Sequence, residues 1–212
     1  MKKQALLGAA LGLALSFGAA SMANAAVFTF TQQGCSVSCG PGPYGTVTVT
    51  NDAVLANTLD FMVQLAAGES FHDTNDSQHH ALAFDLVGNP TITISGLGAP
   101  FTANGSQSAG TNAAPSFGSF DYAINLPHGS ATNLTSFSFK ATGAAPLTLD
   151  FNTVGANHIY FTTDIFGTTG QTGNVGATAG VPEPASWALM LVGFGGLGAA
   201  LRLRRRQTLA LA

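Results

Sequence analysis

The side chains most capable of chemistry gather in residues 71–80, a segment rich in histidine and aspartate. The candidates are His72, Asp73, Asp76, His79 and His80. Imidazole and carboxylate groups are ligand types for divalent cations. Their spacing does not match the His-Glu-x-x-His pattern of zinc proteases, and it lacks the Gly and Glu positions of a calcium loop. Two interpretations stay open: a solvated loop between strands, which we favour, and a divalent-cation site, the one cofactor the sequence suggests.

Motifs of known catalytic chemistry are missing from the sequence. No Gly-x-Ser-x-Gly segment marks a serine nucleophile. Nothing marks a carboxylate pair for glycoside hydrolysis. The single tryptophan, Trp187, lies in the C-terminal tail, so the domain has no tryptophan on which a sugar ring could stack. We therefore expect a non-enzymatic protein with no catalytic residues. The alternative is a secreted domain that binds or hydrolyses carbohydrate.

Cys35 and Cys39 are the two cysteines of the chain and lie four positions apart. A redox pair usually has the tighter Cys-x-x-Cys spacing, and a metal site would need further ligands close by in the sequence. In an exported protein a structural disulfide is the default. We expect these two residues to form one that staples a turn.

The region over 26–167 has the pattern of β-strands. Candidate strands cover 27–31, 45–50, 58–65, 81–87, 91–94, 120–126, 134–140, 147–151 and 158–166. Turn residues such as Asn104-Gly105 separate them, and the alternating threonines are expected on solvent faces. This predicts an all-β fold, an antiparallel β-sandwich of jelly-roll type. Residues 96–118 are either a long loop or a poorly marked hairpin, and 168–180 is expected to be a flexible Gly/Thr linker.

The charge of this region excludes one class of partner. The whole chain has a formal net charge of −3, but residues 26–180 contain one basic residue, Lys140, and nine acids, so one minus nine gives −8. Nucleic-acid binding needs clustered Lys and Arg to displace counterions. We expect no nucleic-acid partner.

Residues 1–25 have the three parts of a secretory signal peptide. Lys2 and Lys3 form the charged start, residues 5–20 are apolar, and Ala23-Asn24-Ala25 is a small-x-small cleavage site. The mature chain is expected to begin at Ala26.

A second apolar run, over 185–203, predicts a transmembrane helix. As a helix it would be roughly 28 Å long, close to the thickness of the hydrocarbon core. The cationic residues at its end are Arg202, Arg204, Arg205 and Arg206. They are expected in the cytoplasm, which places the preceding domain outside. Small residues such as Gly195 could bring two such helices together. We favour the other interpretation, that this thin helix is held in the membrane temporarily.

The end of the chain carries a recognisable motif. Pro182, Glu183 and Pro184 are followed by Trp187 and Ala188, then by an apolar Gly-Phe-Gly run and the Arg cluster. Order and spacing resemble the PEP-CTERM sorting signal, in the variant with Trp-Ala after the tripeptide. Residues 207–212 extend beyond it as a short cytoplasmic tail.

This resemblance implies a route and a set of partners. Proteins with such tails are bacterial surface proteins that exosortase, a membrane-embedded cysteine transpeptidase, recognises and processes. Pro182, Glu183 and Pro184 would be the recognised residues. The family tends to accompany exopolysaccharide and biofilm formation. The expected partners are therefore the membrane, a transiently bound exosortase and exopolysaccharide, with a final location at the cell surface or outside the cell.

Overall fold

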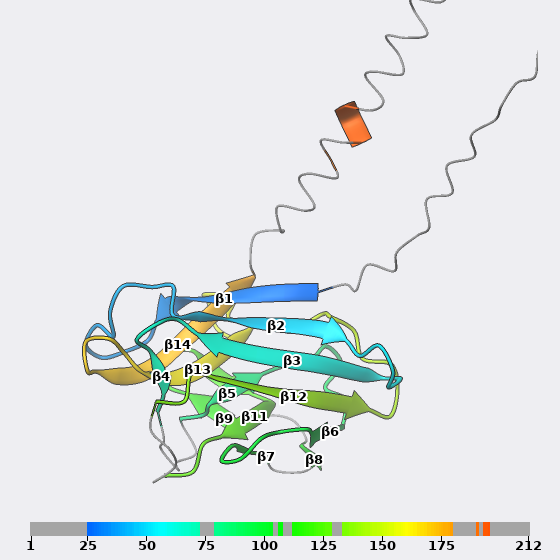
Figure 1. Cartoon of the computed structure of the whole chain (residues 1–212), viewed down its shortest axis with the longest axis horizontal. Coiled ribbons are helices and arrows are strands. Elements are labelled where there is room, and N and C mark those ends of the chain that lie inside the picture. Colours follow the sequence, from blue (N-terminus) through cyan, green and yellow to red (C-terminus); the bar gives the residue numbers. More distant parts are fainter. Residues whose placement is uncertain are drawn as a thin grey trace, which may run out of the picture.

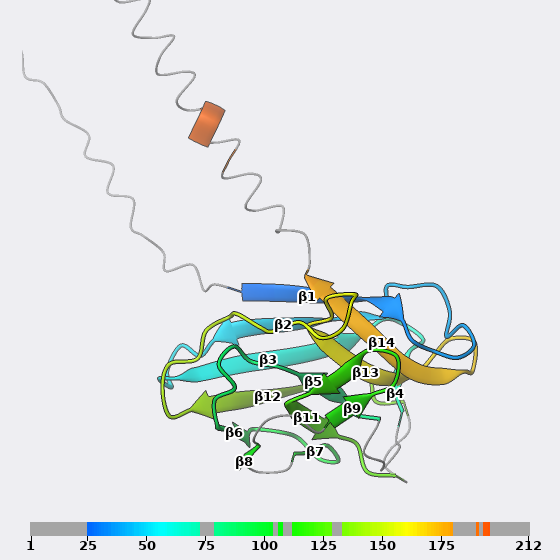
Figure 2. The ribbon, with the colours of Figure 1, turned by 180° about the vertical axis from the view of Figure 1, so that it is seen from behind.

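The structure is a computed structural model, and it describes residues 25–72, 79–103, 106–107, 112–128, 133–179, 190 and 193–195. The described part is built from antiparallel strands, and one sheet of twelve strands makes up most of it. Figures 1 and 2 show this sheet folded over so that its two halves form opposing layers. The all-β, antiparallel prediction is confirmed. The jelly-roll connectivity stays a prediction.

The first layer holds four of the long strands, three from the start of the domain and one from later in the chain. Its strands, in spatial order, are β1 (Ala25–Gln33), β2 (Gly45–Asn51), β3 (Thr58–Leu65), β12 (Ser136–Gly143), β6 (Ile92–Ser95) and β8 (Ser106–Gln107). Buried and more exposed residues alternate along β2, β3 and β12, as expected for strands with one face on a core. The threonines Thr46, Thr48 and Thr50 lie on the outer, half-buried face of β2.

The second layer continues from β1 in the other direction. Its strands are β14 (Thr172–Ala179), β13 (Phe161–Phe166), β5 (Leu82–Phe84), β11 (Tyr122–Asn125) and β7 (Thr102–Ala103), with β4 (Ser70–Phe71) also paired to β13. A separate hairpin is formed by β9 (Asn112–Ala114) and β10 (Gly118–Phe120). In this layer β13 is buried over most of its length, which shows that it is covered on both faces.

Phenylalanine rings fill the space between the layers. Phe61 of β3 stacks on Phe139 of β12 with ring centroids 4.5 Å apart. The same ring contacts Phe84 of β5 at 5.1 Å and Phe161 of β13 at 6.5 Å. Because these partners belong to the second layer, Phe61 joins the two halves of the sheet. Buried aromatic rings provide large apolar areas for such a core.

A second, smaller core lies under the β9–β10 hairpin. Its buried members are Ala83, Ala114, Phe117, Phe120, Ala123 and Ile159. The hairpin therefore covers the outer face of the second layer, which explains why strands there do not alternate between apolar and polar residues. It also resolves part of the 96–118 segment in favour of a hairpin, since 112–114 pair with 118–120.

Two sequence expectations are wrong. Residues 147–151 do not form a strand, and only Phe151 makes an isolated bridge, to Leu86. The flexible linker predicted for 168–180 is replaced over most of its length by β14, which pairs with β13 on one edge and with β1 on the other. The Gly-rich composition reflects close packing, because a Cβ on Gly176 would lie 2.9 Å from Ile159 and 3.1 Å from Phe117.

Candidate functional sites

The seam between β1 and β14 brings the two ends of the domain together. Phe28 pairs with Ala179, and Thr29 pairs with Thr178. On the other edge of β1, Ala25 pairs with Thr50. The predicted signal peptide ends at Ala25, and its other residues lie outside the described part of the chain. The chain thus enters the domain and leaves it on neighbouring strands.

The predicted disulfide is present between Cys35 and Cys39, whose Cα atoms are 6.1 Å apart. It closes a small loop after β1, and this loop packs on the turn between β13 and β14. The Thr169 hydroxyl donates a hydrogen bond to the Ser38 carbonyl oxygen at 2.6 Å. At Gly167, a Cβ would lie 2.2 Å from the carbonyl oxygen of Cys39. The disulfide therefore fixes one chain segment against another, beyond stapling its own turn.

A buried carboxylate lies near this loop. Glu69 is 3% exposed, and its Oε2 has no hydrogen-bond partner. Burial raises the pKa of Glu69. The pKa of Tyr44 is also raised, first by burial and then by the charge of Glu69. The Tyr44 hydroxyl lies 2.7 Å from both the Gly40 carbonyl oxygen and Gln33 Oε1.

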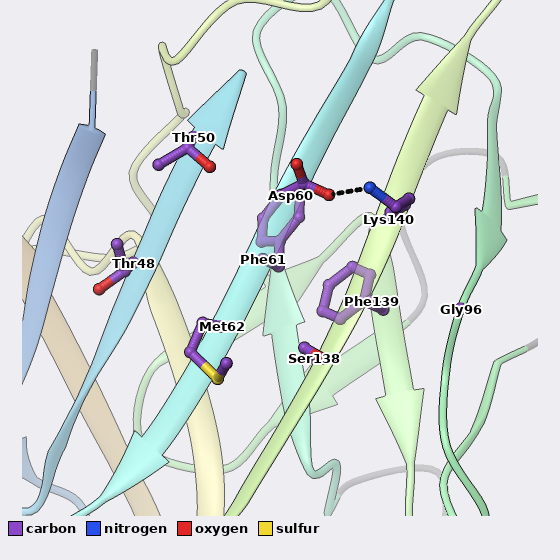
Figure 3. Close-up of a pocket in the computed structure, with 9 residues that line it drawn as sticks. All are labelled: Thr48, Thr50, Asp60, Phe61, Met62, Gly96, Ser138, Phe139 and Lys140. Carbon is purple, nitrogen blue, oxygen red and sulfur yellow. Dashed lines mark hydrogen bonds and ion pairs between the residues drawn. The ribbon is translucent and has the colours of Figure 1, made fainter. Parts of the chain in front are cut away.

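A shallow cleft of about 310 Å³ lies on the outer face of β2, β3 and β12. Figure 3 shows Lys140 of β12 directed toward Asp60 of β3, with Met62 and Ser138 further along these two strands. Lys140 Nζ donates to Asp60 Oδ1 at 2.6 Å and also bonds to Asp52. Lys140 is thus the one cation that the sequence places in the domain, and two carboxylates already neutralise it.

Asp52 links this ion pair to the turn that follows β2. Its Oδ1 accepts the backbone N–H groups of Val54 and Leu55, both at 2.7 Å. The Leu55 N–H and then the Lys140 ammonium lower the pKa of Asp52 to about 2. The hydrogen bonds that the Lys140 ammonium donates to Asp52 and then to Asp60 raise the pKa of Lys140. The arrangement is suited to holding the turn and the sheet together, and the rest of the cleft lining is threonine and serine hydroxyl groups, a methionine thioether, two phenylalanines and a glycine.

The histidine cluster is organised by Asp164 of β13, a residue that the sequence did not single out. His72 Nδ1 lies 2.8 Å from Asp164 Oδ2, and Asp164 is fully buried. The backbone N–H of His72 donates to the backbone carbonyl oxygen of Asp164. The backbone N–H of Asp164 donates in turn to the carbonyl oxygen of His80. Asp164 therefore holds both His72 and His80 in place.

The remaining members of the cluster are dispersed or undescribed. His80 Nδ1 lies 2.7 Å from Asn125 Oδ1, whereas His79 lines a pocket beside the disulfide. Asp73 and Asp76 lie outside the described residues. Among the residues that the structure describes, no three His, Cys, Asp or Glu side chains come together as a metal site. The divalent-cation site stays a prediction.

Two buried aspartates form an acid pair in the second layer. Asp85 follows β5 and accepts a hydrogen bond from the backbone N–H of Asp121. Burial raises the pKa of Asp85 to about 6, with a further contribution from the Asp121 charge, and burial also raises the pKa of Asp121. The adjacent Tyr122 has its pKa raised to about 12, first by burial and then by the two aspartates. Both carboxylates are less than a tenth exposed, and neither lines the cleft at Lys140.

Sequence reasoning missed Asp164, the acid pair and the ion pairs of Lys140. All of these link residues far apart in the chain: Asp164 lies 92 positions from His72 and Lys140 lies 88 from Asp52. The one available signal was an aspartate inside an otherwise apolar or hydroxyl-bearing strand, as at Asp164. A buried charge of that kind needs a partner.

The sorting residues predicted from the sequence lie outside the described part of the chain. They are Pro182, Glu183, Pro184, Trp187, Ala188, Arg202, Arg204, Arg205 and Arg206. Of the helix predicted over 185–203, the structure describes Met190 and residues 193–195, which are helical. Within the described residues, no helix has the length and apolar character needed to span a bilayer.

Comparisons with known proteins divide the chain into two parts. No curated protein and no solved structure matches it. The family model of the PEP-CTERM protein-sorting motif matches residues 180–206. This match begins one residue after β14 ends at Ala179. The chain therefore carries a PEP-CTERM protein-sorting motif, which indicates export and exosortase-type sorting to the cell envelope.

Proposed function

We propose that this chain is a non-enzymatic protein of the cell surface or extracellular matrix, delivered by its sorting motif. One observation carries the proposal. The motif begins at residue 180, directly after β14, a strand paired on both edges within the sheet. The signal is thus joined to a folded domain, which is the cargo that sorting delivers. The Cys35–Cys39 disulfide agrees with this route, because disulfides persist in oxidising compartments.

The proposal also covers how the tail is processed and where the released domain acts. An exosortase would bind Pro182, Glu183 and Pro184 and release or transfer the domain, after transient anchoring through 185–203. The released domain would act in a hydrated matrix, in association with exopolysaccharide or biofilm. Its charge of −8 over residues 26–180 and the hydroxyl-bearing outer face of β2 and β12 favour solubility in such a setting.

A second candidate is a secreted carbohydrate-binding or glycan-hydrolysing domain that uses the same export route. The pocket beside the disulfide, lined largely by polar side chains, favours the binding form of this candidate. Hydrolysis is disfavoured, because glycosidases need two carboxyl groups that flank the substrate. Asp85 and Asp121 are both buried, and the other close pair, Asp52 and Asp60, is held in ion pairs with Lys140.

The test is the intact mass of the protein from its native organism, measured in the cell-bound fraction and in the medium. We expect a mass that lacks residues 1–25 and the residues after the Pro-Glu-Pro motif. Replacing Pro182, Glu183 and Pro184 by alanine should leave the tail attached, whereas the neighbouring Val181→Ala should be processed normally. A wild-type mass that retains Arg202–Arg206 would overturn the proposal and make the tail a permanent anchor.

A further inference from the structure

A pocket lies at the end of the domain that carries the disulfide. Its volume is about 560 Å³, within the range of small-molecule sites. Residues from the end of β1, from the start of β14 and from the β9–β10 turn line it. The polar side chains around it are those of Gln33, Ser36, His79, Ser116, Thr172 and Asn174.

Hydrogen bonds between these three segments form the pocket in advance of any ligand. The Gly34 N–H donates to the Asn174 carbonyl oxygen at 2.9 Å, and the Ser116 hydroxyl donates to the Gly34 carbonyl oxygen at 3.0 Å. The Asn174 side-chain amide reaches the Pro115 carbonyl oxygen at 3.4 Å, and Asn174 is 3% exposed. Each wall is therefore tied to a neighbouring wall, which reduces the entropy lost when a ligand binds.

Three further features make the walls rigid. Gly173 contacts the disulfide closely, since a Cβ there would lie 2.8 Å from the Cα of Cys35. Ser116 has a φ of 79°, a conformation that costs energy for a residue with a side chain. On the β1 side, the Gln33 amide oxygen is held by the Tyr44 hydroxyl at 2.7 Å. Backbone strain that the surrounding structure holds in place is found at ligand sites.

The pocket lies at the far end of the two strands that connect to the sorting elements. β1 runs from Ala25, next to the predicted signal peptide, to Gln33 at the pocket, and β14 runs from Thr172 at the pocket to Ala179, next to the sorting motif. Eight residues of strand span about 25 Å. In Figure 1 the blue loop after β1 and the turn before β14 lie together at one end of the sheet, away from the start of β1. The pocket is thus at the opposite end of these strands from the points where the chain enters and leaves the domain.

We propose that this pocket binds a neutral, hydroxyl-rich ligand, namely a short stretch of a glycan chain. None of the described residues that line it is Asp, Glu, Lys or Arg. Within the described lining there is thus no Lys or Arg for a phosphate or carboxylate and no Asp or Glu for a metal ion, and His79 is its one ionisable side chain. Amide and hydroxyl side chains both donate and accept hydrogen bonds, as sugar hydroxyl groups do. The inference specifies the ligand of the carbohydrate-binding candidate and rests on the proposed export route only for the source of the glycan.

The experiment measures binding of defined glycans to the purified full chain in detergent. The neutral probes are dextran, cellohexaose, maltohexaose and chitohexaose, and alginate is the anionic comparison. We expect at least one neutral probe to bind and alginate not to bind. Ser36→Trp should weaken binding by about tenfold or more, because an indole would fill the pocket. Val37→Trp is the matched control: Val37 is the next residue, is 60% exposed and does not line the pocket, so its affinity should match the wild type.

Failure would take either of two forms. Absence of binding to all four neutral probes would overturn the inference, and so would an unchanged affinity of the Ser36→Trp variant with an unchanged thermal unfolding midpoint. Both outcomes are separate from failure of the sorting proposal, because binding by the purified chain does not depend on tail processing. If the purified chain binds a neutral glycan but the protein in its native organism keeps its tail, the sorting proposal alone is contradicted.

Discussion

Phe28 of β1 lies directly opposite Ala179 of β14 in the sheet, although one residue follows the predicted signal peptide and the other precedes the sorting motif. Phe28 also packs in the core, with its ring 4.8 Å from Phe161 and 5.3 Å from Phe151. The first and last strands of the domain therefore close the connection between the two layers. The strand next to the sorting motif is part of the fold.

This pairing predicts where the chain can be shortened. A chain that stops after Ala179 should fold and unfold cooperatively, because β14 keeps its partners on both edges. A chain that stops after Gly167, where the sequence suggested a domain boundary, should lose cooperative unfolding. It would leave edges of β1 and β13 unpaired and remove Val175 and Ala177 from the core.

Circular dichroism during heating measures the difference. The full-length chain is the control, and the chain ending at Ala179 should share its transition. If the chain ending at Gly167 melted cooperatively at the temperature of the full-length chain, β14 would be dispensable and the described topology would be contradicted.

The long strands of the first layer could be predicted from sequence because each has one face in the core and one toward solvent. Along β2 and β3 this gives the alternation of apolar and polar residues that marks a strand. The cysteine spacing likewise predicted the disulfide correctly. In these cases the deciding information lies within a few neighbouring residues.

β14 escaped prediction for a physical reason. It is buried from Asn174 to Ala177, so no polar face alternates with an apolar one. Its glycines suggested flexibility, yet Gly173 and Gly176 leave no room for a side chain beside Cys35 and Ile159. Which of these two roles a glycine has depends on distant neighbours. The pairing of His72 with Asp164 was hidden for the same reason, since only the β4–β13 contact brings them together.

The disulfide is expected to stabilise the domain modestly. Replacing both Cys35 and Cys39 by serine should lower the free energy of unfolding by about 2 kcal/mol, the loop-closure value for so short a loop. Denaturant titration measures the change. A reductant should bring the wild type to the midpoint of the variant and leave the variant itself unchanged. Equal midpoints for oxidised wild type and variant would show that the bond contributes nothing.

Contact between the disulfide loop and the β13–β14 turn can be tested apart from the bond. Gly167→Ala would place a Cβ 2.2 Å from the Cys39 carbonyl oxygen, so the loop and the turn must move apart. We expect a loss of about 1–3 kcal/mol in the free energy of unfolding, typical of overpacking. Gly98→Ala is the matched control, because nothing lies within 4 Å of a Cβ there. Equal stability of the two variants would refute the close packing.

The acid pair predicts how stability depends on pH. Burial raises the pKa of Asp85 to about 6, from an ordinary value of 3.8. Between pH 4 and pH 6 the folded state holds a proton that the unfolded state has released, so the free energy of unfolding falls as pH rises through this window. The loss should reach about 1–3 kcal/mol, since one pKa unit corresponds to about 1.4 kcal/mol.

Asp85→Asn isolates this effect. An asparagine keeps an oxygen that accepts the Asp121 N–H but cannot ionise. The variant should therefore be more stable than the wild type at pH 7, and the two should converge near pH 4 in denaturant titrations. Asp150→Asn, at an exposed position, should follow the wild type throughout. Some slope should remain in Asp85→Asn, because burial also raises the pKa of Asp121. A wild type that gains stability from pH 4 to pH 7 relative to Asp85→Asn would mean that Asp85 is ionised and favourably paired in the folded state.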